Sequence, residues 1–342
     1  MSMIDANGTV TNGEFTLELA LSCSAGEVVA LLGPNGAGKS TSLRAIAGLA
    51  SLAAGRISIA GSVVDDAGST FVPTERRRIG MVFQDYVLFP HLTVRENIAF
   101  SPHARDVDAW INRLNLHDVA DRKPTKISGG QAQRCALARA LATDPAVLLL
   151  DEPLAALDAG TRMSVRSELR SHLTSGAFGS ILVTHDPLDA MVLADRIVVV
   201  EHGTITQQGT ALEVASTPRT EYVASLMGVT LLRGTAHNGV LNCDDGGTLV
   251  SATTQVAGRA IALVRPESIA LHRARPEGSP RNVFATTVTE MSTTVDRVRV
   301  TLAGPPALVA TVTAGAVAEL GLAIGASVWV SLKATEVELH AA

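Results

Sequence analysis

The pattern of apolar residues differs between two parts of the chain, which meet near residue 228. Up to that point, short apolar runs such as EVVALL, AVLLL and SILVT alternate with stretches whose apolar residues recur at helical spacing. This alternation predicts a parallel sheet with crossover helices. From about residue 229 the pattern changes to short Val/Thr/Ala runs separated by Gly and Pro. We therefore expect an α/β domain over residues 1–228 and a compact all-β domain over residues 229–342.

The second part repeats itself. GRAIALVRPESIALH, which starts at Gly258, is echoed with a one-residue slip by GASVWVSLKATEVELH, which starts at Gly325. Such an echo predicts two similar half-units. We expect an OB-like fold built either as two small barrels or as one double barrel.

Composition and charge narrow the class of protein. Hydrophobic residues make up 46% of the 342 residues, but the longest apolar runs are strand-sized. None approaches the ~20 residues of a membrane-spanning helix, and the N-terminus lacks the features of a secretory signal. The net charge is −5, and ERRR at 75–78 is the main basic cluster, which argues against nucleic acid as a partner. Cys23, Cys135 and Cys243 are isolated, so reduced and buried thiols in a cytoplasmic protein are expected.

The strongest chemical motif is GPNGAGKST at residues 33–41, which follows EVVALL, precedes LRAIAGL and fits GxxxxGKS. Glycines let the backbone N–H groups of such a loop turn inward on phosphate oxygens, and the helix N-terminus adds partial positive charge. Lys39 would reach the β- and γ-phosphates, and Ser40 would place its hydroxyl on Mg²⁺. The candidate nucleotide contacts are Gly33, Pro34, Asn35, Gly36, Ala37, Gly38, Lys39, Ser40 and Thr41.

Polar residues also follow other strand-like runs. AVLLL ends in Asp151 and Glu152, SILVT in His185, and MVF in Gln84. Ligands of open parallel sheets bind outside the carboxyl ends of the strands, so one nucleotide site would gather all of these residues. Asp151 suits the coordination of a metal through water, Glu152 would orient or polarise the attacking water, and His185 would hold the γ-phosphate or that water. Gln84 would reach the metal or the water through its amide. Taken singly, the carboxylates also fit a helix cap and the histidine a turn.

Together, these motifs resemble those of the ATP-binding-cassette ATPases, in the order that family has them. GPNGAGKST is similar to its phosphate loop, Gln84 to its glutamine loop, ISGGQ to its signature, LLLDEP to its magnesium and catalytic-base motif, LAALD to its D-loop and His185 to its switch histidine. The resemblance covers residues 1–228 and implies a P-loop NTPase fold with a helical subdomain at about 86–145. It implies that Glu152 is the catalytic carboxylate and that Asp151 and Ser40 serve Mg²⁺. It also places Asp158 at a dimer seam.

The signature at residues 127–131 raises the question of what its two glycines do. Ser128 would open a helix with the inward face Ala136, Leu137, Ala140 and Leu141. An ordinary N-cap explains the serine alone, whereas two glycines let a bulky anion approach the backbone. In the family this helix end meets the nucleotide held by a second subunit. Ser128, Gly129, Gly130 and Gln131 are therefore candidates to bind a partner's ATP, in a homodimer or, alternatively, a heterodimer.

The chain departs from the family pattern in two places. Ile127 opens the signature where Leu is usual, which conserves volume. The family stacks adenine on an aromatic residue ahead of the phosphate loop, but GTVTNG has none. Phe15, in FTLELAL, is interpreted as a core residue, and the adenine contact stays unassigned.

Partners follow from the resemblance. In the family, the segment after Gln84 docks helices of separate membrane subunits, although packing inside its own domain is the alternative here. The chain would then lie at the cytoplasmic face of the membrane and work indirectly with a substrate-binding protein outside the cell or in the periplasm. The apolar residues of this segment are Tyr86, Val87, Leu88, Phe89 and Leu92.

The C-terminal part resembles the regulatory oxyanion-binding β-domain (TOBE/Mop-like) of importer ATPases. SPRNVF, VTAGAVAELGLAIGASVWV and LKATEVEL are similar to its small molybdate-binding repeat over roughly 279–340. Ser279, Arg281, Asn282 and Lys333 are candidate donors to a tetrahedral oxyanion, unless they are ordinary residues at strand ends. The ERRRIGMVFQDYVLFPHLTVREN stretch is also more similar to the molybdate importer's ATPase than to that of the sugar importers.

The resulting hypothesis is an ATPase that uses ATP and Mg²⁺ to power import of an oxyanion, with molybdate favoured. Sulfate or thiosulfate, iron and polyamine are alternative cargoes. An oxyanion store or sensor that acts through the β-domain is a different class. An ATPase acting on nucleic acid or ribosomes is disfavoured, because the chain has one phosphate loop, no heptads and an acidic balance.

Overall fold

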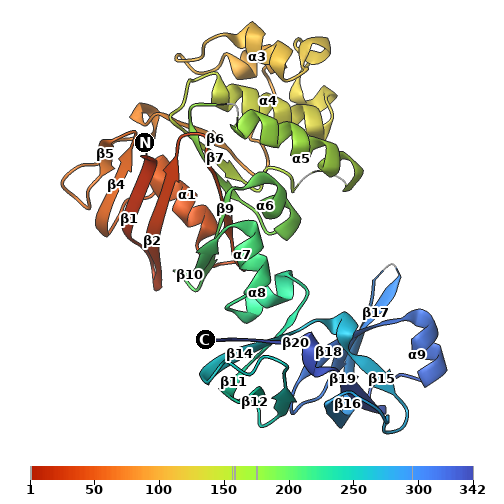
Figure 1. Ribbon diagram of the computed structural model, residues 1–342. Coiled ribbons are helices and arrows are strands. Elements are labelled where there is room, and N and C mark those ends of the chain that lie inside the picture. The colour runs from red at the N-terminus through yellow and green to blue at the C-terminus, as the bar shows by residue number, and fades with distance from the viewer. Residues whose placement is uncertain (1, 156, 158, 175, 295, 342) are drawn as a thin grey trace. The chain divides into compact units, whose positions relative to one another are not determined.

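The computed structural model describes residues 2–155, 157, 159–174, 176–294 and 296–341 (Figure 1). The chain forms two compact units, residues 1–214 and 215–342. Helix α7 (Ala211–Ser216) spans this division, and α8 (Glu221–Leu226) belongs to the second unit. Within the described ranges, no helix is both long and apolar enough to cross a bilayer.

A six-stranded sheet forms the centre of the first unit, in the order β10-β9-β3-β8-β7-β6. The five strands from β9 to β6 pair in parallel, and β10 adds an antiparallel edge. Every residue of β3 and β8 is buried, and so are most residues of β7. Such burial is typical of strands that are covered on both faces. The strands are β3 (Val28–Leu32), β6 (Ile79–Val82), β7 (Val147–Asp151), β8 (Gly179–Val183), β9 (Arg196–Glu201) and β10 (Thr204–Gly209). The connecting helices are α1 (Lys39–Ala47), α5 (Ala159–Thr174) and α6 (Pro187–Leu193).

A separate antiparallel sheet, in the order β2-β1-β4-β5, is the part of this unit that the sequence analysis did not foresee. Its strands are β1 (Ser2–Asn12), β2 (Phe15–Ser24), β4 (Ala54–Ile59) and β5 (Ser62–Asp65). In β2, alternate residues from Leu17 to Cys23 are buried and those between them are exposed. This period of two is typical of an antiparallel strand with one buried face, and the expected parallel sheet with crossover helices did not include it.

Arg77, from the basic ERRR cluster, lies inside this unit and joins α1 to the antiparallel sheet. Its side chain is fully buried, and it donates to the carbonyl oxygens of Ala45 and Ile46 at 2.9 and 2.8 Å. It also donates to the carbonyls of Val72 at 2.7 Å and Val64 at 3.3 Å. The residue is therefore a structural cation and not part of a surface patch.

A helical subdomain follows β6. Its α-helices are α2 (Val94–Ile98), α3 (Val107–Arg113) and α4 (Gly129–Leu141). The predicted inward face of α4 is confirmed, because Ala136, Leu137, Ala140 and Leu141 are all buried. Figure 1 shows α3, α4 and α5 together on one side of the first unit.

The second unit contains two five-stranded sheets, in the orders β13-β12-β11-β14-β20 and β15-β19-β16-β17-β18. One hydrophobic core, which includes Leu241 and Val330, draws residues from both sheets. The strands are β11 (Thr230–His237), β12 (Val240–Cys243), β13 (Thr248–Val250), β14 (Gly258–Val264), β15 (Ala270–His272), β16 (Asn282–Thr293), β17 (Arg297–Leu302), β18 (Leu308–Thr313), β19 (Ser327–Leu332) and β20 (Val337–Ala341). The helix of this unit that follows β18 is α9 (Ala314–Leu320).

The sequence echo corresponds to an interlocked pair of half-units. Each copy is a strand, a 3₁₀ turn and a second strand: β14, Pro266–Ser268 and β15 in the first copy, and β19, Ala334–Glu336 and β20 in the second. β14 pairs with β20, and β15 pairs with β19. Each copy therefore contributes one strand to each sheet, and the halves share a core. This arrangement is a double unit and not two separate barrels.

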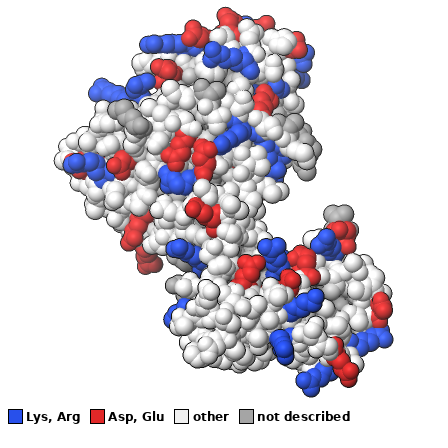
Figure 2. All heavy atoms as spheres, viewed as in Figure 1, with Lys and Arg blue, Asp and Glu red and all other residues white. Residues whose placement is uncertain are grey.

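The three cysteines are free and buried, as expected. On the face drawn in Figure 2, acidic and basic side chains are interspersed over both units.

Candidate functional site

The predicted polar residues meet at the carboxyl edge of the central sheet because four neighbouring strands deliver them. Gln84 follows β6, Asp151 and Glu152 end β7, His185 follows β8, and Gly33 follows β3. The register of these parallel strands pairs Val82 with Leu150, Asp151 with Val183, and Leu31 with Val183. Each candidate thus lies within two residues of a paired position, which brings the motifs of four distant segments to one edge.

The phosphate loop between β3 and α1 is bound by the side chain of its own lysine and lies close against β9. Lys39 is 6% exposed, and its Nζ donates to the carbonyl oxygens of Gly33 at 2.7 Å and Pro34 at 2.8 Å. Burial lowers the pKa of Lys39, and the carboxylates of Glu152 and Asp151 oppose that shift. A Cβ at Gly33 would lie 2.0 Å from the carbonyl oxygen of Val200, so this position requires glycine.

Ser40 and Asp151 form a pair of oxygen ligands at the start of α1. The Ser40 hydroxyl donates to Asp151 Oδ1 at 3.1 Å. Burial raises the pKa of Asp151, and the hydrogen bond from Ser40 acts in the opposite direction. A hydroxyl beside a carboxylate is a donor set that suits Mg²⁺, which usually keeps waters and substrate phosphate as its other ligands.

Glu152 and His185 form the second pair. His185 Nδ1 lies 3.0 Å from Glu152 Oε2, and their side chains are 57% and 18% exposed. Glu152 has φ of +46°, in a region that non-glycine residues seldom adopt, and its N–H donates to Val183 at 2.9 Å. A carboxylate on a residue with strained backbone, beside an accessible imidazole, is an arrangement typical of functional sites.

The segment after Gln84 divides into buried and exposed residues. Gln84 itself is exposed. Tyr86 is 6% exposed, and its hydroxyl donates to the carbonyl of Pro153 at 3.3 Å, next to Glu152. Tyr86 therefore packs inside its own domain and does not belong to a docking surface, whereas Val87 is 53% exposed.

The signature forms the N-terminus of α4. The Ser128 hydroxyl accepts from the N–H of Gln131 at 3.3 Å, and Gln131 Oε1 accepts from the N–H of Ser128 at 2.9 Å. This reciprocal capping box accounts for both side chains, and Gly129 beside it is exposed. The helix start is thus a capped, accessible group of backbone donors on the first unit. Asp158, the expected seam residue, lies outside the described residues.

Phe15 packs against the core of the first unit, as interpreted from the sequence. It also lies beside the phosphate loop, because a Cβ at Gly38 would be 3.2 Å from Phe15 Cζ.

The four oxyanion candidates of the β-domain do not form one site. Asn282 is 4% exposed. Its side-chain oxygen accepts from the N–H of Val250 at 2.7 Å, and its side-chain nitrogen donates to the carbonyl oxygen of Val250 at 2.9 Å, so the residue joins two strands. The expectation that its amide donates to an anion is wrong for this reason. Ser279 and Arg281 are exposed, and only Lys333 lines a cavity of about 430 Å³.

Arg265 lines the same cavity and was missed by the sequence analysis. The echo itself carries the signal that identifies it, because the two copies align Arg265 in VRPES with Lys333 in LKATE. Both residues immediately precede the 3₁₀ turn of their half-unit.

Two protein-family models and several known proteins match this chain. The ABC transporter family model matches residues 17–155, and the TOBE domain model matches residues 278–339. The molybdenum import ATP-binding protein ModC of Mycobacterium tuberculosis (strain ATCC 25618 / H37Rv) is 42% identical over 95% of this chain and 94% of that protein. The sulfate/thiosulfate import ATP-binding protein CysA 1 of Chromobacterium violaceum is 40% identical over 78% of this chain and 77% of that protein.

Two further similarities bear on cargo and fold. The sn-glycerol-3-phosphate import ATP-binding protein UgpC 3 of Agrobacterium fabrum is 39% identical over 81% of this chain and 79% of that protein. The chain is also similar to the dimeric post-hydrolysis structure of the ATP-binding cassette MJ0796, bound to ADP and Pi, with 31% sequence identity and a TM-score of 0.51. The match covers 62% of this chain and 99% of that chain.

Proposed function

Because the chain belongs to the ABC transporter ATPases and carries a TOBE domain, we propose that it is the ATP-hydrolysing subunit of an importer, with molybdate as the cargo. The observation that supports this proposal most is the meeting of Lys39, Asp151, Glu152 and His185 at one sheet edge. Membership of the family implies that the chain binds and hydrolyses ATP and has the cassette fold. The roles of individual residues, Mg²⁺ and the cargo are proposals.

In the proposed mechanism the protein mainly positions and neutralises charge, because phosphoryl transfer needs little covalent help. Lys39 and the backbone donors of the phosphate loop hold the β- and γ-phosphates. Ser40 and Asp151 would hold Mg²⁺, and the ion would supply positive charge to offset that of the transferred phosphoryl group. Glu152 orients the attacking water and accepts its proton, while His185, 3.0 Å away, keeps that carboxylate in place and faces the γ-phosphate.

The proposed active unit is a head-to-tail homodimer. The phosphate loop and the start of α4 belong to the same chain, so one chain offers two half-sites for nucleotide. The N-terminus of α4 presents backbone N–H groups at Gly129 and Gly130, which suits the γ-phosphate of ATP on a second copy. The dimeric state of MJ0796 supports this arrangement.

Membrane subunits are the proposed partners, and the chain would lie at the cytoplasmic face of the membrane. An apolar cavity of about 380 Å³ on the first unit is lined by residues that include Leu49, Phe83 and Phe100. Leu49 is 53% exposed and Phe100 58% exposed, which is unusual for large apolar side chains unless a partner covers them. Val87 adds a further exposed apolar residue from the segment after Gln84.

The test begins with the purified full chain. Phosphate release from Mg-ATP should be measurable and should disappear in Lys39→Ala together with nucleotide affinity. Co-expression with its membrane partner, followed by reconstitution in vesicles, then identifies the cargo. Molybdate should stimulate ATP hydrolysis more than sulfate or glycerol phosphate do. Equal stimulation by sulfate would overturn the choice of molybdate, and absence of any ATPase activity would overturn the enzyme assignment.

A second, regulatory role is favoured by the cavity that Arg265 and Lys333 share. Arg265 and Lys333, which the internal repeat relates, line one cavity of about 430 Å³ together with Glu267 and Glu336, and their guanidinium and ammonium groups would be the donors to a divalent oxyanion. Equilibrium dialysis of the full chain with labelled molybdate tests this role. Loss of one class of binding site in Arg265→Gln and Lys333→Gln supports it, and unchanged binding in both variants excludes it.

A further inference from the structure

Three arginines on α5 lie four residues apart, and two of them bind the segment that carries His185. Arg162, Arg166 and Arg170 share one face of the helix, as residues at this spacing do. Arg162 and Arg166 contact the loop after β8, whereas Arg170 contacts Asp195 at 2.6 Å and the carbonyl of Leu193. Their side chains are 26%, 14% and 31% exposed, so all three are largely shielded from water.

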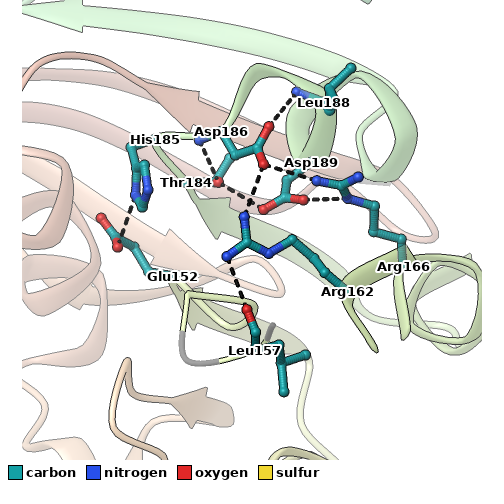
Figure 3. Close-up of polar contacts among 9 residues, drawn as sticks. All are labelled: Glu152, Leu157, Arg162, Arg166, Thr184, His185, Asp186, Leu188 and Asp189. Carbon is teal, nitrogen blue, oxygen red and sulfur yellow. Dashed lines mark hydrogen bonds and ion pairs between the residues drawn. The ribbon is translucent and has the colours of Figure 1, made fainter. Parts of the chain in front are cut away.

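The first two arginines converge on the residue next to His185 (Figure 3). Arg162 Nη1 lies 3.3 Å and Arg166 Nη2 2.9 Å from the same oxygen, Asp186 Oδ2. Arg166 also binds Asp189 through Nε at 2.5 Å. Asp186 caps α6 by accepting from the N–H of Leu188 at 2.8 Å. The loop that bears His185 is thus fixed to α5 by two guanidinium groups.

Arg162 has a second attachment, to the loop that follows Glu152. Its Nη2 donates to the carbonyl oxygen of Leu157 at 3.2 Å. Leu157 is 6% exposed, and its N–H donates to the carbonyl of Leu154 at 3.2 Å, so this loop is itself a compact turn. One planar side chain therefore joins the loop after the predicted catalytic carboxylate to the loop of the predicted switch histidine.

We propose that Arg162 is a positioning residue for ATP hydrolysis, which keeps His185 and Glu152 in register by tying their two loops together. The inference rests on the proposed function and goes beyond it, because Arg162 itself does not touch the reacting groups. The stretch of sequence that follows Glu152 contains Asp158, the residue expected at the dimer seam. A partner subunit that sets the position of this loop would then act on the contact between His185 and Glu152 through the bonds of Arg162.

The geometry separates this role from simple stabilisation of the fold. Arg166 also binds Asp186, so removal of Arg162 leaves that carboxylate paired and avoids the large cost of a buried unpaired charge. What is lost is the bond to Leu157 and hence the link between the loops. A lysine at 162 keeps a charge near Asp186, but a single ammonium cannot reproduce the two-armed attachment of the planar guanidinium.

Arg170 offers a matched control on the same helix. It has similar exposure and also binds one carboxylate and one carbonyl oxygen. Its partner Asp195 accepts from the N–H of Val28 at 2.8 Å, at the start of β3 and away from His185. Loss of Arg170 should therefore affect stability without affecting the register of the two loops.

The experiment compares Arg162→Gln, Arg162→Lys and Arg170→Gln in the full-length protein. We expect both Arg162 variants to lower kcat about tenfold, the effect of one charge-assisted hydrogen bond, with KM and ATP affinity unchanged. Arg170→Gln should lower the melting temperature and leave kcat within about twofold of the wild type. If Arg162→Gln fails to fold, the lysine variant carries the comparison.

Amide hydrogen exchange gives a readout that does not depend on activity. The peptide that spans residues 153–161 should exchange faster in both Arg162 variants and at the wild-type rate in Arg170→Gln. Equal effects of Arg162 and Arg170 variants on kcat or on exchange would overturn the inference, as would full recovery of kcat by lysine. A wild-type protein without ATPase activity would instead refute the proposed function, and the exchange experiment would still decide the link between the loops.

Discussion

Replacement of Arg77 by methionine should destabilise the first unit far more than the same change at Arg76 or Arg78, its neighbours in the chain. Methionine has a similar length and no charge, so it removes the cation with little change in volume. Arg77 is fully buried and donates to four backbone carbonyl oxygens, two of which lie in the last turn of α1. Burial lowers the pKa of Arg77, and Asp65 opposes that shift.

The size of the expected loss in unfolding free energy follows from Asp65, which stays in place after the substitution. Asp65 is 1% exposed and lies 4.0 Å from Arg77, so it becomes a buried carboxylate without a cation. Breaking a buried pair from one side costs about 3–5 kcal/mol. Asp65 still accepts from the N–H groups of Leu52 at 3.1 Å and Ala67 at 3.3 Å, which moves the expected loss of unfolding free energy toward about 3 kcal/mol.

The matched comparison is Arg78→Met. Arg78 is 64% exposed and lies 3.6 Å from Asp144, which is 77% exposed. An exposed ion pair of this kind contributes about 0–1 kcal/mol. Arg76 is exposed as well and provides a second control.

Denaturant unfolding monitored by tryptophan fluorescence measures the difference. The chain has two tryptophans, Trp110 in the first unit and Trp329 in the second, so a Trp329→Phe background lets Trp110 report on the first unit alone. If Arg77→Met changed the unfolding free energy by no more than Arg78→Met does, the assignment of Arg77 as a structural cation would be refuted.

Four further predictions concern the nucleotide site and the thiols. Glu152→Gln should keep ATP binding, lower phosphate release by about 10²–10⁴-fold and accumulate an ATP-bound dimer on size exclusion; a normal rate removes Glu152 from its role. Gly129→Asp should leave ATP binding to the phosphate loop intact and stop hydrolysis, and loss of binding instead would contradict the intersubunit site. Burial raises the pKa of Cys23 and of Cys135 to about 12, so the native protein should resist iodoacetamide at about pH 8. Because these pKa values lie above the unfolded value of 9.0, the stability they contribute should persist below pH 9 and fall as the pH rises toward 12, which denaturant titrations at several pH values would check.

Sequence and structure agree most where the chemistry is local. The phosphate loop needs glycines and a lysine within nine consecutive residues, and the strand and helix that flank it are visible in the same stretch. The inward face of α4 follows from helical spacing alone, and its buried residues are those that the spacing predicted. The general rule for parallel sheets also predicted from the sequence that Asp151, Glu152 and His185 lie at one edge.

The differences concern burial and pairing between distant segments. Tyr86, Asn282 and Arg77 are polar or amphipathic residues that each suggest a surface role from the sequence. In the structure each binds backbone atoms of another segment, at Pro153, Val250 and Ala45 respectively. No local pattern reveals such partners, because they come together only when strands and helices pack.

The sequence by itself indicated the family and a division into two parts, and it predicted which residues lie at the carboxyl edge of the central sheet, because motif spacing and hydrophobic period are properties of short segments. Only the tertiary structure decided which of the polar residues are free to act. It placed the Asn282 amide between two strands, lined one cavity with both Arg265 and Lys333, and joined the two loops through Arg162. The physical reason is that exposure and hydrogen-bond partners depend on contacts between residues far apart in the chain.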